Sequence, residues 1–377
     1  MQERLPDSDY QQLHHFISHS AWDAIGVMGE VARKTQQSLS AVGGSSGLLL
    51  DESGWEKAGQ KSVGGARQYI SNVGKVTNAQ VGVFSALCKG DKAGLVNARL
   101  YLPAAWSADG KRYQAAGIPA QQQAYRSKPQ LALEMVTDLA GKVTYDWVGG
   151  DAIYGNSPEL RHYLLEQKQA FVLDVGQQLK VYLTDPQPYL PASALGKGRK
   201  PTQLLSEQQP LALKELLHTI ADEQWQTLPY RQGSKGSLQR QAVLLKVWLW
   251  KSQDKQLAQC LHLLISRELD GSEIKFSLCY QPQTTSDLAT SLYRQMQRYW
   301  IKRAFQDIKQ EVGLHQYQVR SWTAWYHHIA LTMMALHFMI HAQIEHQQDI
   351  PLLSCPDIKL ILAKTLTHKL NDPLGIW

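Results

Sequence analysis

The stretch Gly47-Leu-Leu-Leu-Asp51 places three consecutive leucines directly before an acidic residue. A short, continuous apolar run of this kind predicts a strand that is buried on both faces of a sheet. We expect the strand to end at Asp51, so that the carboxylate stands at its carboxyl end. In an open α/β sheet, functional groups gather at this edge.

A second acid occurs in the same context further along the chain. Residues 143–148 predict another strand, which is followed by Gly149-Gly150-Asp151. Taken alone, either aspartate could serve as a turn or helix cap. Two carboxylates brought together at one sheet edge repel each other unless a divalent cation lies between them. The pair therefore favours a metal site, with carboxylates about 4–7 Å apart on neighbouring strands.

The segments around these two acids indicate an α/β chain in which several strands precede any long helix. Apolar periodicity predicts helices at 9–19 and from about Asp23, and strands at 63–70, 80–87, 96–101 and 170–175. Pro129 and Gly141 mark the two ends of a helix over 129–139. Ser157-Pro158-Glu159 combines an N-cap, a first-turn proline and an acid, and opens a further helix.

The pattern changes between residues 178 and 284. Strand-like runs alternate there with Pro-rich and basic loops such as Gly196–Lys200 and Arg231–Lys235. These runs cover 179–183, 241–250, 261–265 and 274–280. The segment predicts a β-rich insertion. From Thr285 the chain is helical again, and a second long helix covers about 321–343.

This reading divides the chain into five parts. The first is an N-terminal helical segment, and the last is a C-terminal tail. Between them we expect a core that is interrupted by the insertion and completed by helices. In chain order, the parts are the N-terminal helical segment (1–46), the first part of the core (47–177), the β-rich insertion (178–284), the helices that complete the core (285–346) and the tail (347–377).

Composition limits the class of protein. Of the 377 residues, 44% are apolar and 19% charged, which excludes disorder and leaves material for a large core. Lys+Arg 39 minus Asp+Glu 33 gives +6, a mild basic balance that permits a polyanionic partner without requiring one. The four cysteines have no CxxC spacing, which disfavours a zinc ribbon or a disulfide framework. With no signal peptide or membrane-spanning run, we expect a cytoplasmic protein without a membrane partner.

Several longer motifs resemble the transposases of bacterial insertion sequences, specifically the cut-and-paste DDE group. The resemblance covers about residues 5–345. Its motifs are Leu48–Lys57, Lys61–Tyr69, Gly74–Phe84, Ala98–Pro103, Trp147–Gly155, Arg298–Gln306, Glu311–Leu314 and Val319–Trp322. The resemblance implies an RNase H-like mixed sheet flanked by helices, with a β-rich insertion before the third acid.

The resemblance also implies the activity and its partners. Such a protein performs metal-dependent strand cleavage and transfer at insertion-sequence ends, using Mg²⁺ or Mn²⁺. Its partner is double-stranded DNA at the element ends, which a homodimer holds in a synaptic complex. The protein would be nucleoid-associated. The family carries an additional helical stretch before the residues that match Leu5–Ser8, so we expect either weaker recognition of the element ends or recognition by the core alone.

The catalytic residues are carried over position by position. Asp51 and Asp151 match the first two metal ligands, but the family's third acid corresponds to Lys302. At 100° per residue, Arg298, Lys302 and Lys309 share one helix face, where their charges suit DNA phosphates. Asp307 and Glu311 would lie on other faces of a regular helix and are not nominated as ligands.

Lys302 leaves two functions open. Its ammonium group would pair with Asp51 or Asp151 and compete with the metal, so a transposase of this sequence is expected to be impaired. The alternative is a catalytically inactive, transposase-derived DNA-binding protein or repressor. Whether the lysine is natural or engineered stays open. A nuclease of the same fold with another purpose is a third reading, against which the insertion argues.

Two further groups of residues have a functional and a structural reading. Lys57, Lys61 and Arg67 follow the first acid strand and suit contact with DNA phosphates, although a solvated loop is the alternative. Trp322, Trp325 and Tyr326 could stack on bases. Aromatic residues at helical spacing are, however, more often part of a core.

Overall fold

The fold is described from a computed structural model, which covers residues 9–70, 73–191, 202–233, 236–251, 258–282, 286–316, 318 and 320–370. The chain forms two compact units. The first contains Met1–Tyr145 and Tyr299–Trp377, and the second contains Asp146–Arg298. The five-part division expected from the sequence stays a prediction.

The strands of the first unit are antiparallel and centre on β3 (Lys75–Lys89). One edge of β3 pairs with β1 (Ser46–Glu56). Its other edge pairs with β2 (Ala66–Ile70) and β4 (Lys92–Leu100). Residues 79–88 of β3 are buried without interruption, because helices cover both faces of these strands.

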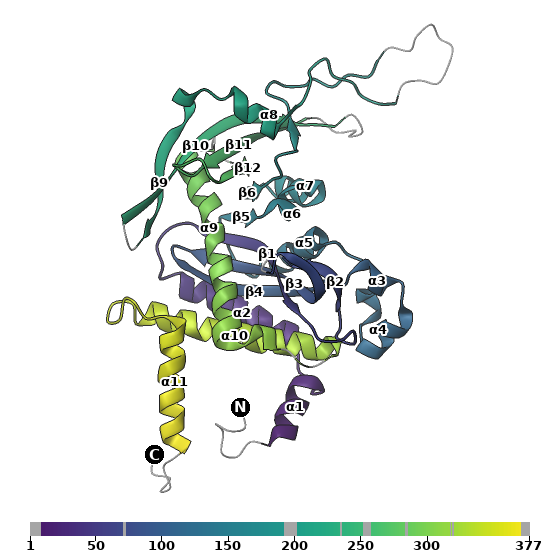
Figure 1. The fold of residues 1–377 in the computed structure, drawn as a ribbon, viewed down its shortest axis with the longest axis vertical. Helices are drawn as coiled ribbons and strands as arrows, with labels where there is room; N and C mark the ends of the chain where they lie inside the picture. The colour runs from purple at the N-terminus through teal and green to yellow at the C-terminus, as the bar shows by residue number, and fades with distance from the viewer. Residues whose placement is uncertain are drawn as a thin grey trace. The chain divides into compact units, whose positions relative to one another are not determined.

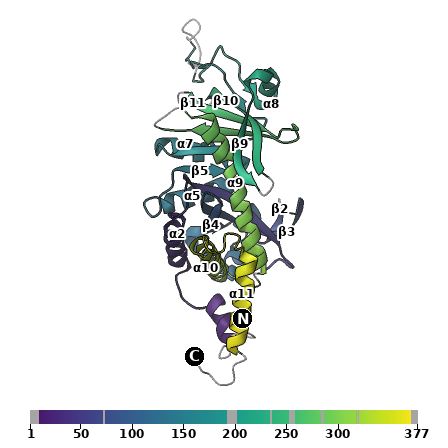
Figure 2. The same ribbon diagram turned by 90° about the vertical axis from the view of Figure 1, so that its left-hand side faces the viewer.

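The covering helices come from distant parts of the sequence. Figures 1 and 2 show α5 (Lys128–Leu139) on one side of the strands and α2 (Ala24–Leu39) with α10 (Trp322–Glu345) on the other. Trp325 is fully buried and Tyr326 is 7% exposed, so the core reading holds for these two aromatic residues. The shorter helices are α1 (Tyr10–Ser18), α3 (Ala104–Ser107), α4 (Gly110–Ala116) and α11 (Cys355–Leu370).

The second unit contains a mixed set of strands. In it β5 (Trp147–Gly150) runs parallel to β6 (Ala170–Asp174), and β6 pairs antiparallel with β12 (Ile274–Tyr280). The antiparallel order then continues through β11 (Gln259–Arg267), β10 (Gly236–Leu249) and β9 (Gln226–Gly233). Helices α6 (Ala152–Gly155) and α7 (Pro158–Glu166) follow β5 in the chain, and β7 (Lys180–Val181), β8 (Leu211–Ala212) and α8 (Leu213–Leu216) are short.

Helix α9 (Leu288–Asp307) begins in the second unit and ends in the first. Its first turns bury Leu292 and Met296 against Ala242 of β10 and Leu264 of β11. A π-helical segment, Ile308–Val312, follows α9 directly. None of the described helices combines the length and apolar character that crossing a membrane requires.

The prediction of an α/β chain with a mixed sheet flanked by helices is confirmed. The start signals are also confirmed, since Pro129 lies in the first turn of α5 and Ser157 Oγ accepts from the Leu160 N–H at 3.3 Å. The loop expected at Arg231–Lys235 is wrong in its first part, because residues 231–233 pair with β10 as the end of β9. Helices α4 and α11 were not predicted. Leu5–Ser8, Gly196–Lys200 and Val319 lie outside the described residues.

Candidate functional site

Asp51 lies in the middle of β1 rather than at its end. It stands opposite Phe84 of β3, and the strand continues in register to Glu56. The expected strand end is wrong because Ser53, Gly54 and Trp55 stay buried beyond Asp51, and Trp55 Nε1 donates to Gln80 Oε1 at 3.0 Å. Asp51 is 7% exposed, and its Oδ1 accepts a hydrogen bond from the Glu52 N–H at 2.8 Å. The carboxylate is thus held inside the first unit.

Glu52 is an acidic neighbour of Asp51 that was not predicted from the sequence as a site residue. The two residues bring carboxylate oxygens within 4.8 Å of each other. The apolar run Leu48–Leu50 ends directly before Asp51, which is why the sequence pattern identified Asp51 and not Glu52. Glu52 Oε1 also lies 3.0 Å from Lys128 Nζ at the start of α5. Carboxylate oxygens are the ligands that Mg²⁺ and Mn²⁺ prefer, so these residues fit a divalent ion.

Asp151 immediately follows β5 in the second unit. Its Oδ1 accepts from the Ile153 N–H at 2.9 Å, so it caps the short helix α6. Packing fixes the turn that follows Asp151, because Tyr154 is fully buried and Gly155 packs against β6. A Cβ atom on Gly155 would lie 1.9 Å from the Asp174 carbonyl oxygen, so a larger residue does not fit there. The capping role, which the sequence left open, is therefore present, and it fixes the direction of the carboxylate.

Asp51 and Asp151 belong to different units. Each carboxylate is well placed in its own unit, Asp51 within a buried strand and Asp151 at a strand end. Their expected separation and their joint binding of metal stay predictions.

Lys302 is exposed on α9. The buried stripe of this part of the helix is formed by Ile301, Ala304 and Phe305, and Phe305 contacts Phe84 edge-to-face at 5.3 Å. Residue 302 is turned about 100° from residue 301 and therefore points away from that stripe. The expected pairing of the Lys302 ammonium group with Asp51 or Asp151 stays a prediction.

Lys309 lies in the π-helical segment that follows α9. The assumption of 100° per residue therefore ends at Asp307, two residues before it. Lys309 Nζ donates to the Gly54 carbonyl of β1 at 3.2 Å, and burial lowers the pKa of this lysine. The two acids excluded as ligands are held by cations, Asp307 by Arg303 at 3.3 Å and Glu311 by Lys359 at 3.2 Å.

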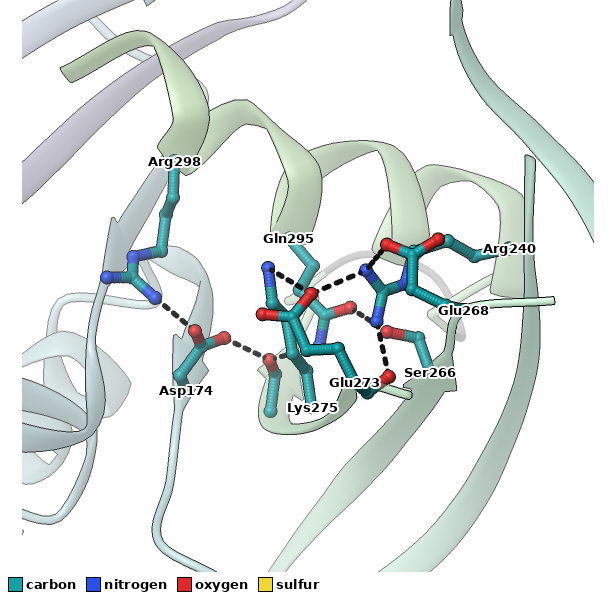
Figure 3. A network of polar contacts seen from close by, with 9 residues as sticks. Asp174, Arg240, Ser266, Glu268, Glu273, Lys275, Gln295 and Arg298 are labelled. Atoms are coloured by element: carbon teal, nitrogen blue, oxygen red, sulfur yellow. Dashed lines mark hydrogen bonds and ion pairs between the residues drawn. The ribbon is translucent and has the colours of Figure 1, made fainter. Parts of the chain in front are cut away.

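Arg298 forms an ion pair with Asp174, the last residue of β6, inside the second unit. Figure 3 shows that this pair ends a chain of hydrogen bonds below α9. Ser266 Oγ donates to Gln295 Oε1 at 2.6 Å, and Gln295 Nε2 donates to Ser277 Oγ at 2.7 Å. Ser277 Oγ in turn donates to Asp174 Oδ1 at 2.5 Å. The Arg298 side chain is 13% exposed, so its DNA contact stays a prediction beside this structural role.

The other predicted DNA-binding residues surround the loop between β1 and β2. Lys57 is half-buried, and burial lowers its pKa to about 8. Lys61 and Arg67 are exposed. Lys57 and Arg67 line one groove of about 580 Å³, of which Lys61 is not a lining residue.

Comparison with known proteins shows the family of the chain and a weak structural likeness. The model of a family described as "DDE superfamily endonuclease" matches residues 1–237. Among solved structures, the NurA nuclease from Sulfolobus solfataricus aligns with a TM-score of 0.27 and 10% identity, over 92% of this chain and 94% of that one. A likeness at this TM-score carries no argument. No curated protein matches the chain significantly.

Proposed function

The chain belongs to the DDE superfamily of endonucleases, and on this premise we propose that it is a transposase that cleaves and joins DNA strands at the ends of an insertion sequence. Its substrate would be double-stranded DNA at the element ends. It would act with Mg²⁺ or Mn²⁺, as a homodimer that pairs two ends, in association with the nucleoid.

The observation that carries the proposal is the buried carboxylate of Asp51. The residue is 7% exposed in the centre of β1 and lies within the segment that matches the family. Burying a charged carboxylate costs free energy unless its charge is compensated, and a divalent cation compensates it most fully. Beside it, Glu52 offers a second oxygen within 4.8 Å.

The residues of the chain have distinct roles in this proposal. Asp51 and Asp151 hold the metal, and the backbone N–H of Ile153 fixes the direction of the second carboxylate. When bound, two divalent ions activate water or a 3′-hydroxyl group and stabilise the leaving oxygen. Glu52 offers a further carboxylate in the first unit, although Lys128 Nζ lies 3.0 Å from its Oε1.

Lys302 supports a second candidate function. It occupies the position at which the related transposases carry their third acid, and an ammonium group cannot bind a cation. We therefore expect DNA binding with weak cleavage. If cleavage is absent altogether, the protein is a transposase-derived DNA-binding protein or repressor.

The first prediction concerns Asp51. We expect Asp51→Asn to reduce strand cleavage by more than the roughly 10–100-fold that losing an outer-shell partner of a metal costs. Glu56→Gln is the matched control, because Glu56 is a half-exposed acid on the same strand. Nicking of supercoiled plasmid carrying element ends, in Mg²⁺ or Mn²⁺, measures the effect.

Two further variants separate the two functions. Lys302→Glu should strengthen Mg²⁺ binding in a calorimetric titration and raise cleavage. Glu52→Gln shows whether this acid supplies a third ligand. Cleavage by the unchanged chain that Asp51→Asn leaves intact would overturn the proposal. Absent cleavage with retained DNA binding would support the second candidate, a transposase-derived DNA-binding protein or repressor.

A further inference from the structure

A groove of about 580 Å³ in the first unit carries a concentration of positive charge. Three of its lining residues are cations, namely Lys57, Arg67 and Arg112, and no lining residue is acidic. Because the cations come from a loop, a strand and a helix, their meeting is a product of the fold. A groove of this charge suits an anion.

Arg112 is held in a fixed orientation. Its guanidinium group lies 4.1 Å from the centre of the Trp106 ring. Its NH2 donates to the carbonyl oxygens of Gln60 at 2.9 Å and Gly65 at 3.2 Å. Trp106 Nε1 donates to the same Gly65 carbonyl at 3.0 Å. The cation is therefore placed before any ligand arrives.

The loop that forms one wall of the groove is also fixed. Asn78 Nδ2 donates to the carbonyl oxygens of Lys57 at 2.6 Å and Gly59 at 2.7 Å. Gly64 has a φ of +71°, and a Cβ atom there would lie 3.0 Å from the Tyr101 carbonyl oxygen. A preformed wall lowers the ordering cost of binding.

An exposed aromatic ring lies beside the cations. Arg67 and Tyr69 are on the same face of β2, two residues or about 7 Å apart. Tyr69 is 58% exposed and stands opposite Val76, which lines the groove and is 53% exposed. Basic grooves flanked by exposed aromatic rings are typical of single-stranded nucleic-acid binding, because every base has a face that can stack.

We propose that this groove binds a backbone phosphate of single-stranded DNA, with the ring of Tyr69 stacked on the adjoining base. The inference rests on the proposed function, since it takes DNA as the substrate, and it adds the form of DNA. Lys57 and Arg112 would contact the phosphate, Arg67 would attract the strand at the edge, and Tyr69 would favour unpaired bases.

The test measures binding of fluorescently labelled oligonucleotides to the full chain by anisotropy, over a range of salt concentrations. EDTA is present throughout. Arg67→Gln should lower the salt slope by about 0.7, which weakens single-strand binding about fivefold near 0.1 M salt. Lys142→Gln is the matched control, because Lys142 is an exposed cation of the same unit and is not among the lining residues.

The ring is tested separately. Tyr69→Ala should weaken single-strand binding about tenfold, whereas Tyr69→Phe should retain it. Arg67 and Tyr69 are both exposed, and unchanged thermal unfolding shows that their variants fold. Equal binding of duplex and single strand with no effect of Tyr69→Ala would overturn the proposal, as would equal salt slopes for Arg67→Gln and Lys142→Gln.

This experiment is independent of cleavage. Because EDTA removes divalent ions, a failure of the proposed catalytic function leaves the binding results unaffected. Conversely, metal-dependent cleavage together with unchanged binding by the groove variants would leave the catalytic proposal standing and reject the groove.

Discussion

At the scale of the residue, Lys57 has a charge that changes in mildly alkaline solution. Burial lowers its pKa from 10.5 to about 8. Arg67 and Arg112 line the same groove and stay charged. His328 of α10 also faces this lysine, and its pKa is lowered chiefly by burial and to a smaller extent by the charge of Lys57. The groove therefore loses one of its three cations as the pH rises through about 8.

We predict that single-strand binding weakens between pH 7 and pH 9, by up to about fivefold near 0.1 M salt, the contribution of one phosphate contact. A bound phosphate raises the pKa of the ammonium group, so the midpoint lies higher in the complex. Lys57→Arg should remove the pH dependence, because arginine stays protonated. Anisotropy titrations at several pH values measure the single-strand affinity. If the affinity of Lys57→Arg fell with pH as much as that of the unchanged chain, Lys57 would not be the group that contacts the phosphate.

At the scale of the element, the Asp174–Arg298 pair attaches α9 to β6. The connected hydrogen bonds through Ser277 and Gln295 extend the attachment to β12 and β11. Every member of this chain comes from the second unit. Buried polar networks of this kind hold an element in one register when all their groups are satisfied.

We predict that Asp174→Asn destabilises the protein by about 3 kcal/mol or more, because it removes the carboxylate that pairs with the buried guanidinium group of Arg298. Ser266→Ala removes one hydrogen bond at the far end of the chain and should cost about 1–2 kcal/mol. Urea unfolding compares the two variants. A smaller loss for Asp174→Asn than for Ser266→Ala would show that the ion pair is not the main attachment.

At the scale of the whole molecule, the proposed metal site draws on both units. Asp51 is in the first and Asp151 in the second, and the family match over residues 1–237 includes both. Two residues that hold the same ions are energetically coupled, whereas residues at separate sites contribute independently.

We predict that Asp51→Asn and Asp151→Asn are not additive. If both carboxylates hold the same ions, the double variant should lose no more Mn²⁺ affinity than the more damaging single variant. Calorimetric titration of the unchanged chain, both single variants and the double variant with Mn²⁺ gives the four affinities of a double-mutant cycle. Losses that add in free energy would mean that the two aspartates act at separate sites.

The sequence by itself determined the features that depend on local pattern. Apolar periodicity located the main strands and helices, and Pro129 and Ser157 marked the starts of α5 and α7, because start signals and periodicity act within a few residues. The sequence also shows that a lysine, Lys302, stands at the position where the related transposases carry their third acid. Asp151 could be placed after β5 for the same local reason.

The tertiary structure alone decided the features that join distant residues. Asp51 lies within a strand because pairing with β3 continues beyond it. Glu52 meets Lys128, 76 residues away, and Arg298 meets Asp174, 124 residues away. Arg112 reaches the loop after β1 in the same manner. No local periodicity encodes such contacts, because they arise when elements that are separate along the chain pack together.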